Sequence, residues 1–193
     1  MEKITFDSGA EYEGETKDGI PHGKGIYTFK NGNVYQGEFV KGKRTGMGKF
    51  SFTNGNLYEG SFADDQPNGK GKLTFASGII YEGDFVNGQQ TGKGKKTLPE
   101  GDTYEGDFIN GQPNGKGKFT ADNGNVYEGE FSNGLLNGKG KAYAPNGEMY
   151  EGDFVDHEYH GKGKLSYPDG RSLEGDWVKG KFAGGRIVGD FTK

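Results

Sequence analysis

The sequence has no cysteine, no long hydrophobic run and few aliphatic side chains. The absence of cysteine excludes disulfide frameworks and thiolate metal sites, and it permits a reducing compartment. No apolar stretch approaches the roughly 18 to 20 residues that a membrane-spanning helix needs. The first six residues, Met1 to Phe6, contain no apolar signal-peptide core. We therefore expect a soluble chain that is not secreted.

Leu, Ile, Val and Phe make up only 35 of the 193 residues, whereas glycine alone supplies 39. So little apolar surface is typical of disordered chains, because its burial hardly offsets the chain entropy lost on folding. Two features oppose disorder: aromatic residues reach 13%, and 24 basic side chains nearly balance 28 acidic ones. The net charge of −4 lacks the basic footprint of a nucleic-acid binder, so no nucleic-acid partner is expected.

An internal repeat of 23 residues accounts for the glycines. A Tyr-x-Gly motif recurs at this spacing without insertion or deletion, and Leu173 takes the tyrosine position in the last copy. Of the 39 glycines, 37 fall into five columns of the repeat. We predict a single repeat domain over residues 1–193, with terminal caps at 1–11 and 182–193. The motif tyrosines are Tyr12, Tyr35, Tyr58, Tyr81, Tyr104, Tyr127 and Tyr150.

Each repeat predicts a β-hairpin. Residues 46–52 and 57–62 are two short alternating runs, and the segment between them contains Asn54-Gly55, a pair that favours a turn with positive φ. No segment has the periodicity or the length of an amphipathic helix. The predicted fold is all-β: an elongated, single-layer antiparallel sheet of about eight successive hairpins, which is about sixteen strands.

Strand alternation separates two faces of this sheet. In the run 81–85, Tyr81, Gly83 and Phe85 share one face, and Glu82 and Asp84 take the other. We call these the aromatic face and the charged face. Half of the acidic residues and half of the basic residues lie in regular columns of the charged face. They are expected to pair across neighbouring strands, at roughly 0.2 to 1 kcal/mol for each pair.

The pattern Tyr-x-Gly-x-Phe/Trp-x-x-Gly-x-x-x-Gly-x-Gly resembles the MORN (membrane occupation and recognition nexus) repeat, with eight copies from Glu2 to about Phe191. The resemblance implies a sheet of successive hairpins that binds or organises other molecules, with any catalysis in another domain. Such proteins include junctophilins, plant phosphatidylinositol phosphate kinases and ciliary or cytoskeletal proteins. The chain departs from the family in having Phe where Trp is favoured. Small side chains in a second aromatic column, such as Ala121 and Ala144, would widen a groove there or reflect drift.

A one-layer sheet has no second layer over its aromatic face, so part of that face should stay accessible. We predict a non-catalytic scaffold whose aromatic groove receives a helix or an extended peptide of another protein, in a cytoskeletal, ciliary or membrane-associated assembly. Alternatively, the rings pack only on their own glycines. The predicted partner-binding residues are Tyr35, Phe39, Tyr58, Phe62, Tyr81, Phe85, Tyr104, Phe108, Tyr127, Phe131, Tyr150 and Phe154.

The lysine columns suggest a second function, direct binding of an anionic phospholipid surface. Each lysine near such a surface contributes about 1 kcal/mol, but the acidic columns on the same face oppose the attraction. A third possibility is a regulatory subunit that acts on an enzyme in trans. The lysines proposed for a lipid or charge ladder are Lys70, Lys72, Lys93, Lys95, Lys116 and Lys118.

A strict repeat offers the same side chains every 23 positions, so we expect no catalytic residues, no cofactor and no metal site. His157 and His160 resemble a metal-binding pair only superficially, and we interpret them as solvated loop histidines. Unpaired edges at residues 3–6 and 187–191 predict end-to-end contact or a homodimer. The expected location is the cytoplasm, at the cytoskeleton, a cilium or a membrane surface.

Overall fold

A computed structural model describes residues 1–191, and its contacts divide the chain into two compact units, Met1–Pro99 and Glu100–Lys193. Over these described residues the structure contains no helix long and apolar enough to span a membrane. Unit 1 contains β1 (Glu2–Thr5), β2 (Glu11–Lys17), β3 (Ile20–Thr28), β4 (Val34–Val40), β5 (Lys43–Ser51), β6 (Leu57–Ala63), β7 (Gln66–Thr74), β8 (Ile80–Val86) and β9 (Gln89–Thr97). Unit 2 contains β10 (Thr103–Ile109), β11 (Gln112–Thr120), β12 (Val126–Ser132), β13 (Leu135–Tyr143), β14 (Met149–Val155), β15 (Glu158–Ser166), β16 (Ser172–Val178) and β17 (Lys181–Val188).

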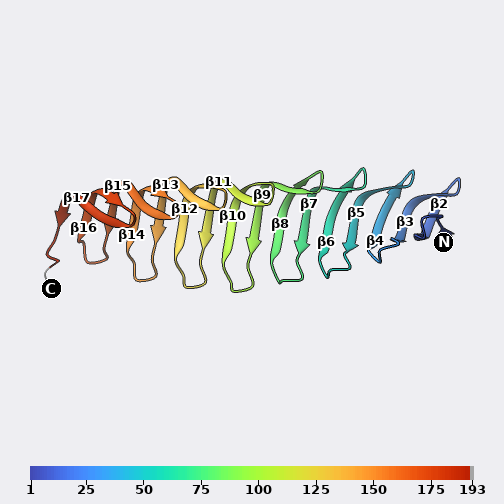
Figure 1. Cartoon of the computed structure of the whole chain (residues 1–193), viewed down its shortest axis with the longest axis horizontal. Coiled ribbons are helices and arrows are strands. Elements are labelled where there is room, and N and C mark those ends of the chain that lie inside the picture. The colour runs from blue at the N-terminus through green and yellow to red at the C-terminus, as the bar shows by residue number, and fades with distance from the viewer. Residues whose placement is uncertain (192–193) are drawn as a thin grey trace. The chain divides into compact units, whose positions relative to one another are not determined.

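Within each unit, every strand pairs antiparallel with its neighbours in sequence, and Figure 1 shows them side by side. The predicted all-β sheet of successive hairpins is therefore confirmed in each unit. Residues 1–191 form one strand more than the sixteen expected, because the predicted N-terminal cap forms β1, where Ile4 lies opposite Tyr12. The predicted C-terminal cap contains most of β17, and its residues 192 and 193 lie outside the described residues.

Two kinds of turn join the strands. The predicted Asn31-Gly32 turn is present, but only Gly32 has positive φ (85°). Its N–H donates to the Phe29 carbonyl at 2.8 Å, and the three-residue loop places the glycine in a left-handed bulge after an ordinary turn. Tighter turns lie at the other ends of the hairpins, for which no turn was predicted from the sequence. There, two successive residues have positive φ, for example Asp18 (54°) and Gly19 (73°).

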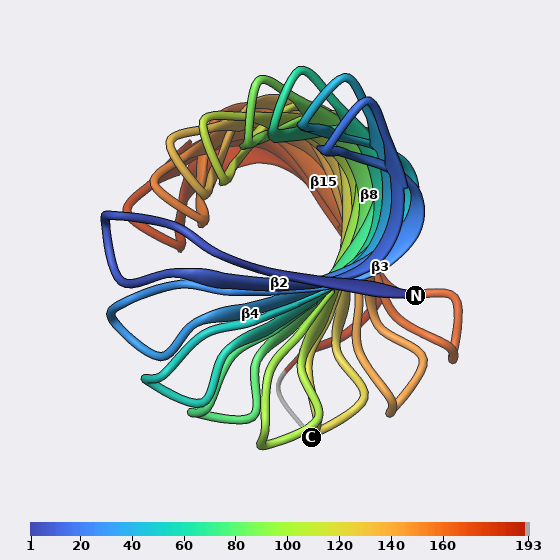
Figure 2. The same ribbon diagram turned by 90° about the vertical axis from the view of Figure 1, so that its right-hand side faces the viewer.

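A bulge bends each hairpin. Gly60 pairs with Gly71 and Phe62 with Pro67, so Ser61 faces three residues of β7 instead of one. Such bulges bend a strand and increase its twist, and the ribbons of β3, β8 and β15 are visibly curved in Figure 2. The bend is toward the aromatic face, because Arg44 of β5, near a tight turn, reaches to within 5.4 Å of the Phe29 ring in the three-residue loop that follows β3.

The core of each repeat is a tyrosine ring that lies on a pair of glycines. The Tyr58 ring covers Gly60 of its own strand and Gly71 of the next strand, and a Cβ atom added to Gly71 would lie 2.6 Å from Cε2 of Tyr58. The Tyr58 hydroxyl donates a hydrogen bond to the Ser61 carbonyl at 2.9 Å. Burial raises the pKa of Tyr58 to about 12, so the hydroxyl remains a neutral donor at physiological pH.

The tyrosines alternate with phenylalanines in a row that we call the core ladder. The Tyr35 ring meets the Phe39 ring of its own repeat edge-on at 5.1 Å and the Phe62 ring of the next repeat at 4.9 Å. The same contacts recur for Tyr58 with Phe62 and Phe85. Each such pair adds roughly 0.5 to 1.5 kcal/mol beyond the area it buries. The core ladder therefore supplies the missing second layer and joins successive repeats.

Replacing Gly71 by alanine should destabilise unit 1 by about 3 kcal/mol or more, because the new methyl group overlaps the Tyr58 ring. The matched control is Gly19→Ala, where φ is 73° but no atom lies within 4 Å of the added Cβ. That exchange should cost only about 1 to 2 kcal/mol, from backbone strain. Urea unfolding midpoints measure both values. Equal costs would contradict the role assigned to the ring.

Candidate functional site

The structure places the twelve predicted partner-binding residues in or beside the core ladder. Eleven of them are at most 4% exposed, and only Tyr127 is half-buried. This burial agrees with the alternative prediction, in which the rings pack on glycines of the chain itself. Their role as anchors for a partner stays a prediction, and the burial leaves little of the eleven rings accessible.

A second row of rings in unit 1 is more accessible. We call it the loop-side ladder, because it lies beside the three-residue loops. Tyr27 lies 4.6 Å from Phe29, Phe29 lies 5.5 Å from Phe50, and Phe50 lies 4.5 Å from Phe52. Phe50 is buried, whereas the other three rings are half-buried. None of these four rings is among the partner-binding residues predicted from the sequence.

Arg44 lies across the aromatic face of unit 1. Its guanidinium carbon is 5.2 to 5.9 Å from the centres of four rings, those of Phe29, Tyr35, Phe50 and Phe62. The Arg44 side chain is 18% exposed, and this degree of burial strengthens cation–π attraction. A guanidinium is therefore a group that this aromatic surface accommodates.

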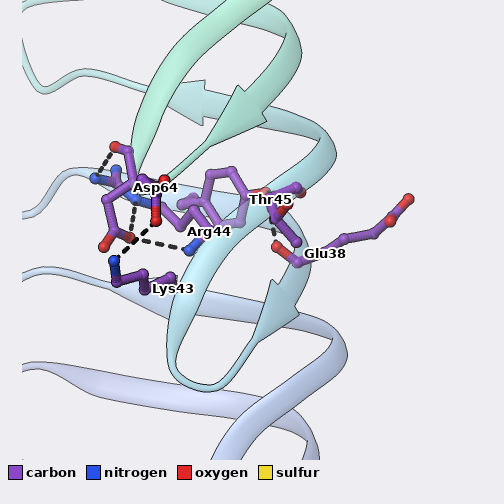
Figure 3. A network of polar contacts seen from close by, with 7 residues as sticks. Glu38, Lys43, Arg44, Thr45 and Asp64 are labelled. Atoms are coloured by element: carbon purple, nitrogen blue, oxygen red, sulfur yellow. Dashed lines mark hydrogen bonds and ion pairs between the residues drawn. The ribbon is translucent and has the colours of Figure 1, made fainter. Parts of the chain in front are cut away.

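Asp65 fixes Arg44 in this position, and Figure 3 shows the polar contacts around Arg44 with Lys43 and Asp64 labelled. The Asp65 Oδ1 atom accepts from the Arg44 backbone N–H at 2.9 Å and from Nε at 3.1 Å, and the Asp65 carbonyl accepts from a guanidinium N–H at 2.5 Å. Beside this pair, Lys43 bonds Asp64 at 2.8 Å, and the hydrogen bond lowers the pKa of the Asp64 carboxyl. The hydroxyl of Tyr35 donates toward the carbonyls of Glu38 and Thr45.

Arg44 belongs to a column of variable residues that cover the core ladder. Each member pairs with the residue two positions before the tight turn of its hairpin. For example, Pro67 pairs with Phe62, and the turn follows at Asp64 and Asp65. We call this set the covering column. Its members are Pro21, Arg44, Pro67 and Gln90 in unit 1 and Pro113, Leu136, Tyr159 and Phe182 in unit 2.

At two of the tight turns the turn residue compensates for the member of the covering column that it contacts, and the first of them involves Arg44. The Gly42 N–H donates to the Pro21 carbonyl at 2.9 Å, and Gly88 makes the same bond to Pro67. Proline has no N–H, so glycine satisfies this contact completely. Arg44 does have an N–H, and Asp65 in place of glycine supplies the acceptor. Arg44 in place of proline and Asp65 in place of glycine are thus one compensated pair.

A hollow of about 350 Å³ opens beside Arg44 on the aromatic face. Rings from both ladders form its walls, and the carboxylate of Asp65 lies at its edge with 44% of the side chain exposed. It is apolar enough to hold a ring or an aliphatic side chain and has one anionic group for orientation. Its lining residues are Tyr27, Phe29, Phe39, Gly42, Arg44 and Asp65.

The charged face carries the predicted lysine ladder, largely paired with acids. Lys70 lies 2.7 Å from Asp84, and their hydrogen bond lowers the pKa of Asp84. Lys72 pairs with Glu82 at 2.9 Å, and Lys118 pairs with Glu128 at 3.2 Å. Lys95 lies opposite Glu82 in the sheet register, and the backbone N–H groups of Lys93 and Lys116 donate to Asp84 and Asp107. The predicted cross-strand pairing is confirmed, and it neutralises most of this surface.

Unit 2 breaks the core ladder at one repeat. A Leu136 methyl group lies against Gly129, and the edge of the Phe154 ring lies against Gly140. These two side chains occupy the space over the glycine pair that a tyrosine ring occupies in other repeats. The Tyr127 ring instead lies 6.2 Å from both Phe119 and His157. The small side chain of Ala142, opposite Tyr127, leaves room for this position.

His157 is not the solvated loop residue that the sequence analysis expected. Its ring packs 6.1 Å from Phe131 and 6.4 Å from Phe119, and its Nδ1 accepts the Leu136 N–H at 3.3 Å. Leu136 and His157 therefore repeat the compensation made by Arg44 and Asp65. Burial lowers the pKa of His157 below its ordinary value. Within residues 1–191 no group of three or more His, Asp or Glu side chains could hold a metal ion.

Comparison with known proteins relates this chain to one family and to several solved structures. The MORN repeat model matches seven copies, at residues 12–34, 35–57, 58–80, 81–103, 104–126, 127–149 and 150–170. No curated protein matches the chain in sequence. The eighth copy predicted from Leu173 is not among the matched repeats.

One solved structure at low identity shares the fold, and a second is a weaker match. The TCP domain of SAS-4 (dCPAP) from Drosophila melanogaster, in complex with a proline-rich motif of Ana2 (dSTIL), has a TM-score of 0.53 and 13% identity. The match covers 91% of this chain and 90% of that chain. A TCP10 domain of CPAP from Danio rerio has a TM-score of 0.41 and 16% identity over 100% of both chains.

Replacing Asp65 by glycine, the residue of the neighbouring tight turns, should destabilise unit 1 by about 1 to 3 kcal/mol, because two donors of Arg44 lose their acceptor. The double variant Arg44→Pro, Asp65→Gly restores the pairing seen at Pro21 and Gly42. We expect it to be more stable than either single variant, with a coupling energy above about 1 kcal/mol in a double-mutant cycle of urea unfolding. Additive effects would contradict the compensation.

Unfolding of unit 2 should depend on pH through His157. Because burial lowers its pKa, the unfolded state binds the proton more readily, so stability is complete above about pH 6.5 and declines as the pH falls below it. His157→Gly, which matches Gly134 and Gly180, should remove this part of the pH dependence. His160→Asn is the control and should retain it. Identical profiles for the wild-type chain and His157→Gly would refute the assignment.

Proposed function

This chain belongs to the MORN repeat family, and we propose that it is a non-catalytic protein-interaction scaffold whose aromatic face binds an extended peptide of another protein. The observation that carries the proposal is the half-buried loop-side ladder of unit 1, with the hollow beside Arg44. Accessible rings gathered on one face of a sheet are typical of binding surfaces.

The fold is compatible with this function. The Drosophila domain that shares it was solved with a proline-rich motif. In our proposal the core ladder holds the sheet rigid, and the loop-side ladder and the covering column contact the peptide. Of the twelve residues first expected to bind, Tyr127 alone has a half-buried side chain and remains a candidate for direct contact. The others act by supporting the surface above them.

Direct binding of anionic phospholipid has less support. The lysines of the charged face lie beside carboxylates, as Lys70 does with Asp84 and Lys139 does with Asp153, both at 2.7 Å. A paired lysine gives little net attraction to an anionic surface. At two further positions of the charged face, uncharged residues stand where other repeats have a lysine and an acid. Ile26 lies opposite Gln36, and Met47 lies opposite Ser61. We therefore place the binding function on the aromatic face.

We also count the hairpin of β16 and β17 as an eighth, divergent repeat. It pairs Gly175 with Gly185 in the position of the earlier glycine pairs. Trp177 takes the place of the phenylalanine in its repeat, and its Nε1 donates to the Gly163 carbonyl at 3.0 Å. The larger indole thus closes the core ladder where Leu173 replaces tyrosine.

Replacing Phe29 and Phe52 together by serine should abolish capture of the partner, because it removes two half-buried rings from the loop-side ladder. The matched control replaces Val40 and Val86 by serine, since these side chains are apolar and 47% and 50% exposed but lie on the charged face. Affinity capture from the native cell with quantitative mass spectrometry compares the variants, and circular dichroism verifies the fold. A partner set that is unchanged by Phe29→Ser with Phe52→Ser would contradict the proposed function.

A further inference from the structure

We propose that the ligand of unit 1 is a polyproline II segment rich in proline and arginine, which runs across the strands with one turn of its helix on each 23-residue repeat. The inference rests on the proposed function and specifies the conformation, register and chemistry of the peptide. Three observations carry it: the spacing of the repeats, the residues that the chain itself places on the aromatic face, and the hollow beside Arg44.

The spacing of the repeats matches a polyproline II helix. Each repeat adds two strands, which advances the sheet by about 9.5 Å. A polyproline II helix has three residues per turn and rises by about 3.1 Å per residue, so one turn advances by about 9.3 Å. Every third residue of such a ligand would therefore meet an equivalent ring of the loop-side ladder. Phe6 and Phe75 occupy the same position of the repeat as Phe29 and Phe52, and all four rings are half-buried.

An α-helix does not fit the same lattice. At 1.5 Å per residue, an advance of about 9.5 Å takes roughly six residues, and at 3.6 residues per turn this leaves the helix about a quarter turn out of phase. The face that contacts one ring would then point away from the next rings. An extended ligand with a period of three residues has no such drift.

The chain shows which side chains the aromatic face accepts. In unit 1 the covering column places Pro21 and Pro67 on this face, the latter opposite the Phe62 ring. Between them lies the Arg44 guanidinium, within 6 Å of four ring centres. A proline ring and a guanidinium are both flat enough to lie on aromatic faces, and the guanidinium also gains cation–π attraction. We infer that the ligand offers the same two residue types to the rings left half-buried.

The hollow beside Arg44 fits one ligand side chain of this kind. Tyr27, Phe29 and Phe39 supply ring surface, and Asp65 supplies a carboxylate at the edge. One oxygen of Asp65 bonds Arg44, and a carboxylate has further lone pairs to accept from a second cation. A ligand arginine in the hollow would meet both the Phe29 ring and this carboxylate, because both line it. The loop-side positions of unit 2 carry alanine at 121 and 144, so the proposal is confined to unit 1.

The test uses fluorescein-labelled synthetic peptides and the full chain, with binding measured by anisotropy at physiological salt. The in-register probe is four copies of Pro-Pro-Arg. A second probe has the same composition but spaces the arginines alternately by two and four residues, and a third presents four arginines on an alanine-based helix. We expect the first probe to bind at least about tenfold more tightly than the other two. Phe29→Ser with Phe52→Ser should weaken it about tenfold, and Val40→Ser with Val86→Ser should leave it unchanged.

Each other outcome overturns the inference. Equal affinity for the two proline-rich probes, unaffected by the change at Phe29 and Phe52, would mean that only general attraction to an acidic chain is observed. Tighter, Phe29-dependent binding of the helical probe would refute the polyproline II ligand and leave the proposed function intact. Absence of binding by all three probes would also refute the ligand, and the cellular capture experiment then judges the proposed function separately.

Discussion

The structure depends on one contact, a tyrosine ring laid flat on two glycines of adjacent strands. A single-layer sheet has no second layer to bury its apolar side chains, so the chain must provide the covering layer from its own strands. The Tyr58 ring does this because neither Gly60 nor Gly71 has a Cβ atom beneath it. Its hydroxyl then ends on the Ser61 carbonyl, at the bulge that bends the hairpin. One side chain thus provides core packing and a fixed position for the bend, and the contact with Phe85 links it to the next repeat.

This constraint separates folding from binding. Residues of the core ladder are fully used in packing, and any change at the glycines or tyrosines affects stability before it affects a ligand. The covering column and the loop-side ladder are free to vary, because they lie above the core ladder or beside it. Proline, arginine, leucine and tyrosine all occur in the covering column, and the arginine and the leucine are matched by a changed turn residue, Asp65 and His157. A repeat that is uniform in its core can therefore present a different surface at every copy.

Much of this architecture follows from the sequence. The 23-residue period determines the hairpins, and alternation about Gly83 assigns Tyr81 and Phe85 to one face and Glu82 to the other, as the structure confirms. The two kinds of turn could not be told apart, because Asn-Gly occurs at both ends of the hairpin. The contacts of Arg44 could not be predicted from the sequence either. They join a residue near a tight turn to a ring near a three-residue loop, and the bulge brings the two ends of the strands closer together. The one indication in the sequence was Asp65, which stands where the neighbouring repeats have glycine.

Tyr127 shows why exceptions in a repeat are informative. Its repeat keeps Gly129 and Gly140, yet the ring does not occupy the seat that they form, because Leu136 competes for it. His157 accepts a hydrogen bond from the Leu136 N–H, and it stands at a turn position where other repeats have glycine. The displaced tyrosine then packs against His157 and Phe119. One apolar substitution has therefore altered three positions and placed a titratable group inside an aromatic cluster. The same logic applied to Arg44 and Asp65 places a guanidinium on the rings of unit 1, so the chemistry of each unit lies in its few compensated departures and not in the repeated core.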